Sequence, residues 1–196
     1  MSDKIIDVIL NRRGIKPEDR SEFLTPDYKK QNDPFLLQDM DAAVPRLVEA
    51  KQAQENITIY GDYDVDGVTA SALLLDSLGK MGFKNVDYFL PDRFIDGYGI
   101  SERAVKIMKG RGTSLILTVD CGSLNHTEIG LANSLGMEVI VTDHHNIAEV
   151  QPNAVAVVNP RRSENKYPGG SNFAGVGVAF KLAQALSSKL SGLENG

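Results

Sequence analysis

The sequence predicts an α/β fold: a parallel sheet of about five strands flanked by helices, with a small helical arm at the amino terminus. Five short β-rich runs alternate with helix-like stretches from Ile57 onward, at the spacing of roughly 30 residues that is typical of βαβ units. The residues before Ile57 show helical spacing and turn signals but no such runs. We therefore expect an arm at residues 1–55 and a sheet domain at residues 56–196.

The arm is predicted to consist of short helices separated by turns. A helix over residues 5–10 ends near Gly14, and Lys16 with Pro17 opens a second short segment. Residues 42–54 carry apolar side chains at helical spacing, which predicts a third helix. No chemically reactive side chains are concentrated here, so we expect the arm to contribute packing.

The sheet domain is predicted from brief apolar runs bounded by turn or polar residues, a pattern typical of buried parallel strands. The predicted strands are residues 57–60, 86–90, 115–119, 138–142 and 155–158. The predicted helices are residues 68–81, 102–109, 124–135 and 175–190. Parallel strands require such crossover connections, which we expect to be right-handed.

Composition excludes several classes of protein. The chain has 196 residues, 42% of them hydrophobic, and a single cysteine, so it can bury a core and cannot form an internal disulfide. No apolar run approaches the ~20 residues of a membrane helix, and no secretory signal is recognisable. We expect a cytoplasmic protein with no membrane partner. The net charge of −5 argues mildly against nucleic-acid binding over the whole surface.

Acidic and imidazole side chains follow three of the predicted strands. The sequence GDYDVDG at residues 61–67 follows the first strand, DCG at residues 120–122 the third, and DHH at residues 143–145 the fourth. Ligands bind at the carboxyl ends of strands in open parallel sheets. Neighbouring strands lie about 4.8 Å apart, so these groups are predicted to converge on one site.

Such a cluster indicates a metal centre, because carboxylates packed together repel one another unless positive charge is present. Aspartate oxygens mixed with imidazole nitrogens and no thiolates favour manganese over calcium or structural zinc. The acidic loop also lacks the glutamate of a calcium-binding loop, since Leu73 occupies that position. The set is large enough for two ions, as in phosphoester hydrolysis, and two ions would make the site attractive to a polyanion.

Periodicity gives two further expectations. In an extended segment Asp62, Asp64 and Asp66 share one face, although the turn into the helix near Gly67 means that not all three need be ligands. The side chains of the adjacent His144 and His145 are expected to diverge, one toward metal and the other toward substrate.

These residues resemble a known family. The sequences GDYDVDG at 61–67, VDCG at 119–122 and DHH at 143–145 resemble the first three motifs of the DHH phosphoesterases, and within them most closely the RecJ single-strand-specific exonucleases. Other RecJ-like stretches are DPFLL at 33–37, PDR at 91–93, GYG at 97–99, NPR at 159–161 and GVGVAFKL at 175–182. The resemblance runs from about residue 11 to residue 186.

The resemblance implies a metal-dependent phosphodiesterase that removes nucleotides from the 5′ end of single-stranded DNA in repair and recombination. It implies as catalytic residues Asp64, Asp66, Asp120, His144 and His145. The first four would ligate a manganese or magnesium pair bridged by Asp120, and His145 would also face the substrate phosphate.

The same resemblance implies supporting residues. Asp62 and Asp143 would orient the ligands, Arg93 would contact phosphate, and Tyr98 would pack against a nucleotide. Single-stranded DNA would be the substrate, with a single-strand-binding protein and a helicase as candidate partners.

One departure from the family pattern concerns its fourth motif, which supplies a further aspartate ligand. This sequence has no aspartate after Asp143, so we expect an incomplete site in the amino-terminal part of a longer enzyme or in a truncated homologue. Two alternatives remain open: a DHH phosphodiesterase of short oligonucleotides or cyclic dinucleotides, and a non-catalytic DHH scaffold that binds nucleic acid or a replication partner. Tyr60 stands where the short-oligonucleotide enzymes typically carry a histidine ligand, which argues against the first.

Overall fold

The computed structural model describes residues 2–25, 27–169 and 172–194, so the outermost ends of the two predicted domains, residues 1 and 195–196, lie outside it. The chain divides into two compact units, Met1–Asn32 and Asp33–Gly196. None of the helices in the described ranges combines the length and apolar character needed to cross a bilayer.

The first unit consists of short helices, as predicted. They are α1 (Ser2–Arg12), η1 (Pro17–Asp19), α2 (Arg20–Leu24) and η2 (Tyr28–Lys30). Gly14 adopts a left-handed conformation with φ of 71° just after α1, which is a common way to end a helix. Arg20 joins the helices, because its guanidinium donates to Asp7 at 2.9 Å and to Asn11 at 2.6 Å.

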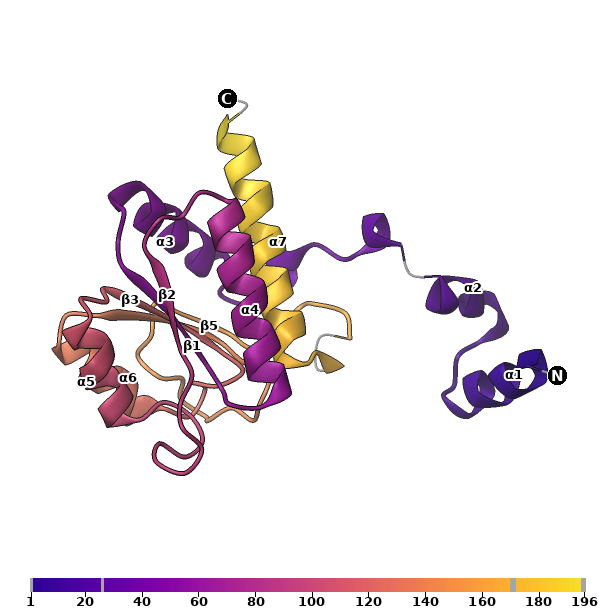
Figure 1. Cartoon of the computed structure of the whole chain (residues 1–196). Coiled ribbons are helices and arrows are strands. Elements are labelled where there is room, and N and C mark those ends of the chain that lie inside the picture. Colours follow the sequence, from indigo (N-terminus) through magenta and orange to yellow (C-terminus); the bar gives the residue numbers. More distant parts are fainter. Residues whose placement is uncertain (1, 26, 170–171, 195–196) are drawn as a thin grey trace. The chain divides into compact units, whose positions relative to one another are not determined.

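The second unit is built on a five-stranded sheet with the order β2-β1-β3-β4-β5 (Figure 1). The strands are β1 (Ile57–Gly61), β2 (Val86–Phe89), β3 (Leu115–Val119), β4 (Glu138–Thr142) and β5 (Ala156–Val158). Every pairing is parallel. Each predicted strand forms within one residue of its expected ends, and the predicted fold class is confirmed.

Helices cover both faces of this sheet (Figure 1). One face carries α3 (Met40–Ala53), α4 (Val65–Lys80) and α7 (Gly175–Glu194), and the other carries α5 (Glu102–Gly110) and α6 (His126–Ser134). The short helix η3 (Pro34–Leu36) precedes α3. Successive side chains along a strand point to opposite faces of the sheet and so contribute to both helical layers. Ile59 and Leu117 pack under α3, α4 and α7, whereas Tyr60 and Ile116 pack on the α5–α6 side.

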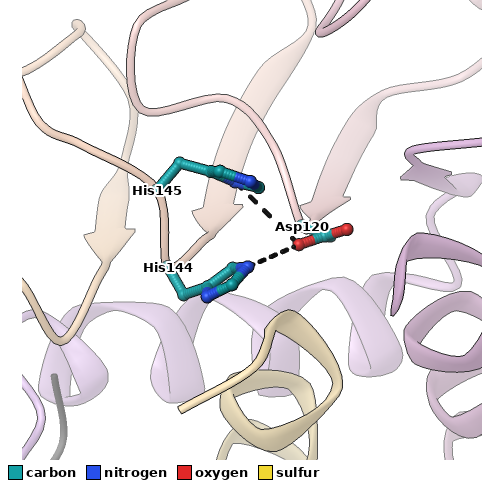
Figure 2. Close-up of side chains that lie close together, drawn as sticks. All are labelled: Asp120, His144 and His145. Atoms are coloured by element: carbon teal, nitrogen blue, oxygen red, sulfur yellow. Dashed lines mark ion pairs between the residues drawn. The ribbon is translucent and has the colours of Figure 1, made fainter. Parts of the chain in front are cut away.

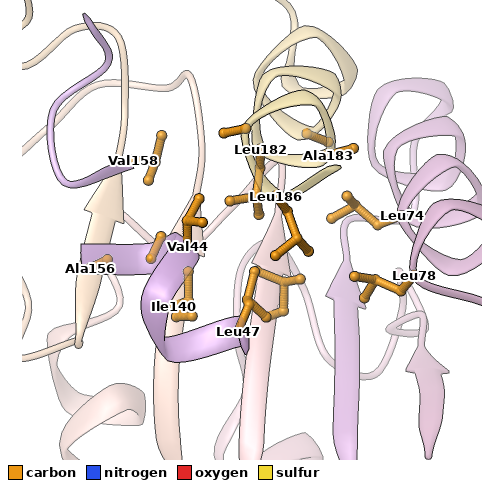
Figure 3. Packing of buried hydrophobic residues seen from close by; sticks show 14 of the residues in the cluster. Val44, Leu47, Leu74, Leu78, Ile140, Ala156, Val158, Leu182, Ala183 and Leu186 are labelled. Atoms are coloured by element: carbon orange, nitrogen blue, oxygen red, sulfur yellow. The ribbon is translucent and has the colours of Figure 1, made fainter. Parts of the chain in front are cut away.

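The larger core lies between the sheet and the three helices α3, α4 and α7 (Figure 3). Leu47 of α3 and Leu186 of α7 are fully buried there, together with Leu74 and Leu78 of α4. The segment from residue 33 to residue 53, which falls within the predicted arm, thus packs with the sheet as part of its compact unit.

Two local differences from the sequence prediction have physical causes. The second strand was expected to be buried, but β2 is an edge strand, and Asp87 and Tyr88 on it are exposed because only β1 pairs with it. Helix α4 begins at Val65, three residues earlier than expected, because the Asp64 side chain caps its first turn.

Leu47→Ala tests whether α3 belongs to the core of the sheet. We expect the free energy of unfolding to fall by about 2–5 kcal/mol, because the substitution opens a cavity at a fully buried site. The matched control is Leu24→Ala in α2, where the side chain is 54% exposed and the change should stay within about 0.5 kcal/mol. Chemical denaturation measures both, and equal effects would contradict the packing of α3 described here.

Candidate metal centre

The acidic motifs meet at the carboxyl ends of the central strands. Strands β1 and β3 are neighbours, but the chain leaves them toward opposite edges of the sheet, to β2 and to β4. This is a topological switch point, where open α/β sheets form a crevice. Asp62 and Asp64 follow β1, Asp120 follows β3, and His144 and His145 follow β4.

Asp120 lies at the centre of the cluster (Figure 2). Its Oδ1 is 3.0 Å from His144 Nε2 and 3.9 Å from His145 Nδ1. One oxygen each from Asp62, Asp64 and Asp120 also lie within 4.8 Å of one another. The structure therefore brings together the carboxylates and imidazoles that the strand ends were predicted to supply.

The Asp120 carboxylate is buried, and no hydrogen bond within the described residues compensates for its loss of water. Its residue is 1% exposed, and among the described residues neither of its oxygens has a hydrogen-bond partner of good geometry. Burial, together with the nearby Asp66 and Asp64 carboxylates, raises the pKa of Asp120 to about 8. Burial also raises the pKa of Asp62, whose Oδ1 likewise lacks a partner among the described residues.

This donor set fits a divalent cation. Manganese or magnesium would satisfy buried carboxylate oxygens that lack protein donors and lie next to imidazole nitrogens. No lysine or arginine among the described residues forms an ion pair with Asp62, Asp64 or Asp120. A cation would supply the missing positive charge and return the Asp120 carboxylate to its ionised form.

Asp64 has a second task as the cap of α4. Its Oδ1 accepts hydrogen bonds from the backbone N–H groups of Asp66 and Gly67, both at 2.9 Å. The bond from Gly67 is the main reason that the pKa of Asp64 is lowered. Gly67 is required here, because a Cβ at this position would lie 2.4 Å from the carbonyl oxygen of Asp62. The cap thus fixes the acidic loop and keeps Asp64 ionised.

Asp66 caps another helix. Its Oδ2 accepts from the N–H of Gly175 at 2.5 Å, and its Oδ1 accepts from Val176 at 2.7 Å, at the start of α7. Its Oδ2 also lies 3.5 Å from His144 Nε2. A Cβ on Gly175 would stand 2.4 Å from Asp120 Oδ1, so this glycine lets α7 approach the centre. The sequence analysis did not foresee that Asp66 would hold α7 in place.

The prediction that His144 and His145 point apart was wrong. Their ring centroids are 4.5 Å apart, and both rings face Asp120 (Figure 2). The chain leaves strand geometry after β4 because Asp143 Oδ1 accepts from the backbone N–H groups of both histidines, at 2.7 and 3.1 Å. The same oxygen lies 2.9 Å from His145 Nδ1. Asp143 therefore lies where it can orient His145.

The NPR sequence at residues 159–161, which follows β5, forms a clamp that was not predicted. Asn159 Nδ2 donates to the carbonyl of His145 at 3.0 Å, and Arg161 Nε donates to the carbonyl of His144 at 2.6 Å. The segment is anchored in turn where Arg162 Nη1 bonds Asp39 Oδ2 at 2.5 Å. The available signal was position, because residues 159–161 follow the last strand at the same edge of the sheet.

The predicted substrate residues border the centre. Arg93 lies over the ring of Tyr63, 4.8 Å from its centroid. The ring of Tyr98, a residue that is 52% exposed, meets the His145 ring edge-on at 5.4 Å. Tyr60, by contrast, is fully buried, stacks on Phe89 and donates its hydroxyl hydrogen to the Gly99 carbonyl. Tyr60 is therefore a residue of the hydrophobic core.

The chain matches known proteins over most of its length. The model of the DHH family, N-terminal domain, matches residues 56–195. The chain is 46% identical over 158 residues to the single-stranded-DNA-specific exonuclease RecJ of Bacillus subtilis, covering 81% of this chain and 20% of that protein. It is 42% identical over 154 residues to RecJ of Escherichia coli, covering 79% of this chain and 26% of that protein.

Solved structures show the same likeness. A crystal structure of exonuclease RecJ bound to manganese superposes with a TM-score of 0.70 at 37% identity, covering 79% of this chain and 38% of that one. RecJ of Thermus thermophilus in complex with manganese gives a TM-score of 0.68 at 31% identity, covering 93% and 24%. The chain thus spans about a fifth to a quarter of the two curated relatives above.

Asp120→Asn tests the charge imbalance in the metal-free protein. Because the pKa of Asp120 is about 8 in the folded protein, the folded state holds a proton on Asp120 between about pH 4 and 8 that the unfolded state has released. The contribution of this group to the free energy of unfolding is therefore fully present below about pH 4 and is lost as the pH rises through about 8. Asparagine tolerates the left-handed backbone (φ of 62°) and cannot ionise. In EDTA the variant should therefore melt higher than wild type at pH 8, by about 2–4 °C or more.

Thermal melts from pH 4.5 to pH 8.5 measure this difference, which should shrink as the pH falls toward 4. Asp76→Asn is the matched control, because that carboxylate is exposed on α4 and pairs only with Lys80 in the described structure. A lower melting temperature for Asp120→Asn at pH 8 in EDTA would show that the Asp120 charge is stabilised by the protein itself.

Proposed function

We propose that this chain, which belongs to the DHH family, carries the metal site of an exonuclease that degrades single-stranded DNA from its 5′ end. One observation carries the proposal: the buried Asp120 carboxylate lies between acidic and imidazole ligands and has no protein donor among the described residues. The relatives named single-stranded-DNA-specific exonuclease support the substrate and the reaction.

The residues that would hold a manganese or magnesium pair are Asp64, Asp66, Asp120 and His144, and Asp120 is the most central of them. Asp62 lies close enough to join them. Bound divalent ions would supply an activated water as nucleophile and offset the charge on the scissile phosphate. Because Asp66 also bonds the amino terminus of α7, it would hold the helix while it faces the ions.

The remaining residues would place the DNA strand. Asp143 fixes the His145 ring through Nδ1, so that Nε2 is the ring nitrogen left to face a phosphate oxygen. Tyr63 holds the Arg93 guanidinium against its ring, which would restrict where that cation meets the backbone. Burial raises the pKa of Tyr98, so its ring stays an uncharged phenol on which a base can stack.

Two other functions receive less support. In the short-oligonucleotide enzymes the position of Tyr60 holds a histidine ligand, whereas here the tyrosine is buried and its hydroxyl bonds the backbone. A non-catalytic scaffold does not require intact ligands, yet Asp64, Asp120 and His144 are all present and close together. The resemblance also supports a role in DNA repair and recombination, with a single-strand-binding protein and a helicase as partners. The composition supports a cytoplasmic location.

Calorimetric titration with manganese tests the ligand set. Asp120→Asn should weaken manganese binding at least tenfold, because it removes the central carboxylate charge. Asp76→Asn on the exposed face of α4 should bind like wild type. Manganese affinity that Asp120→Asn leaves unchanged would contradict the proposed centre.

Hydrolysis assays separate the three functions. The assay uses the chain alone and the chain extended by an aspartate-bearing fourth motif, because the site of the chain alone is expected to be incomplete. With manganese, the extended chain should release mononucleotides from the 5′ end of a long single strand faster than it cleaves a dinucleotide, and Asp120→Asn should abolish the release. Faster cleavage of the dinucleotide would favour the short-oligonucleotide enzyme. Manganese binding without hydrolysis of either substrate by the extended chain would favour the scaffold.

A further inference from the structure

A pocket of about 250 Å³ opens beside the metal centre. Its walls include Tyr98, Leu124, His145 and Arg161, and it is open to solvent on one side. Tyr98 is 52% exposed and Leu124 is 56% exposed, so about half of each side chain is accessible and the pocket offers an aromatic and an aliphatic surface to a ligand. Because His145 is shared with the centre, a molecule in the pocket would adjoin the reacting phosphate.

Arg161 is the cation of this pocket, and only part of its guanidinium is used. Its Nε donates to the His144 carbonyl at 2.6 Å, and its backbone N–H donates to Asn159 Oδ1 at 2.9 Å. Within residues 2–25, 27–169 and 172–194, no hydrogen bond or ion pair involves Nη1 or Nη2 of Arg161. The adjacent Arg162 differs, because its Nη1 pairs with Asp39.

A fixed guanidinium with two available nitrogens is suited to an oxyanion. Arginine presents its donors in a planar fork that matches the oxygens of a phosphate. The bond from Nε to the His144 carbonyl holds this fork in place before any ligand arrives, so less side-chain entropy is lost on binding. The apolar walls beside it suit the sugar and base attached to that phosphate.

We infer that Arg161 binds a backbone phosphate of single-stranded DNA through its terminal nitrogens, while the attached nucleoside lies in the pocket between Tyr98 and Leu124. This inference rests on the proposed function, because it assumes that the strand crosses the metal centre. It adds to that function a second cationic contact, on a different segment from Arg93, and places Leu124 opposite the base that stacks on Tyr98.

Fluorescence anisotropy with a labelled oligodeoxythymidylate of about ten nucleotides, a length within the usual site size of single-strand binders, tests the inference. The full chain is titrated in EDTA and again in manganese, over a range of salt concentrations. Arg161→Gln should weaken binding roughly tenfold and reduce the slope of log K against log salt by about 0.7, the value for one phosphate contact on a single strand.

Arg111→Gln is the matched control, because it removes the same charge at the opposite edge of the sheet, where Arg111 pairs with Asp87. It should leave both affinity and salt slope close to wild type. Equal behaviour of Arg161→Gln and Arg111→Gln would overturn the inference while leaving the metal centre intact. Failure of the wild-type chain to bind the oligonucleotide under both conditions would overturn the inference and the proposed substrate together.

Arg161→Lys distinguishes phosphate binding from support of His144. Lysine keeps the positive charge but lacks the Nε donor to the His144 carbonyl. If residue 161 contacts a phosphate, the salt slope of Arg161→Lys should therefore lie closer to wild type than that of Arg161→Gln. Both variants lose the Nε bond to the His144 carbonyl, so manganese affinity, measured by calorimetry without DNA, should fall to a similar degree in each. DNA binding in EDTA is therefore the measurement that separates them. A large loss of manganese affinity in both variants, with DNA binding in EDTA unchanged, would show that Arg161 acts only through the histidine loop.

Discussion

The structure depends on concentrated negative charge at the switch point between β1 and β3. Asp120 is buried there beside Asp62 and Asp64, and no lysine or arginine of the described residues forms an ion pair with any of the three. A folded chain tolerates such a group only by protonating it or by binding a cation. The raised pKa of Asp120 is the consequence in the absence of a cation. The same imbalance becomes binding energy when a divalent ion is present.

Backbone geometry around the centre serves to keep these charges close. Asp120 adopts a left-handed conformation with φ of 62°, a strained state for a residue with a side chain that is typical of functional sites. Gly67 and Gly175 allow the acidic loop and the first turn of α7 to approach where a Cβ would collide. Asp64 and Asp66 each cap a helix. The packing of α4 and α7 against the sheet is thus coupled to the positions of the ligands.

Most of the fold could be predicted because its signals are local. A buried parallel strand is a short apolar run, and the strand ends gave the positions of Asp64, Asp120 and His144. The direction of the His144 and His145 rings could not be predicted, because the alternation of side chains ends after β4, where Asp143 accepts hydrogen bonds from the backbone N–H groups of the next two residues. The cap that Asp66 makes on Gly175 joins residues 109 positions apart, and no local pattern reports such a pairing.

The order of strands also explains how an acidic chain can accept a polyanion. The acidic residues follow β1, β3 and β4, the inner strands, whereas Arg93 follows β2 and Arg161 follows β5, the two edge strands. Each arginine is held by a neighbour that carries no negative charge: the Tyr63 ring for Arg93 and the His144 carbonyl for Arg161. Divalent cations bound at the centre would offset most of the acidic charge that lies between these two arginines. The net charge of the whole chain therefore says little about this edge, because the field that a DNA strand meets is set by a few groups within a Debye length.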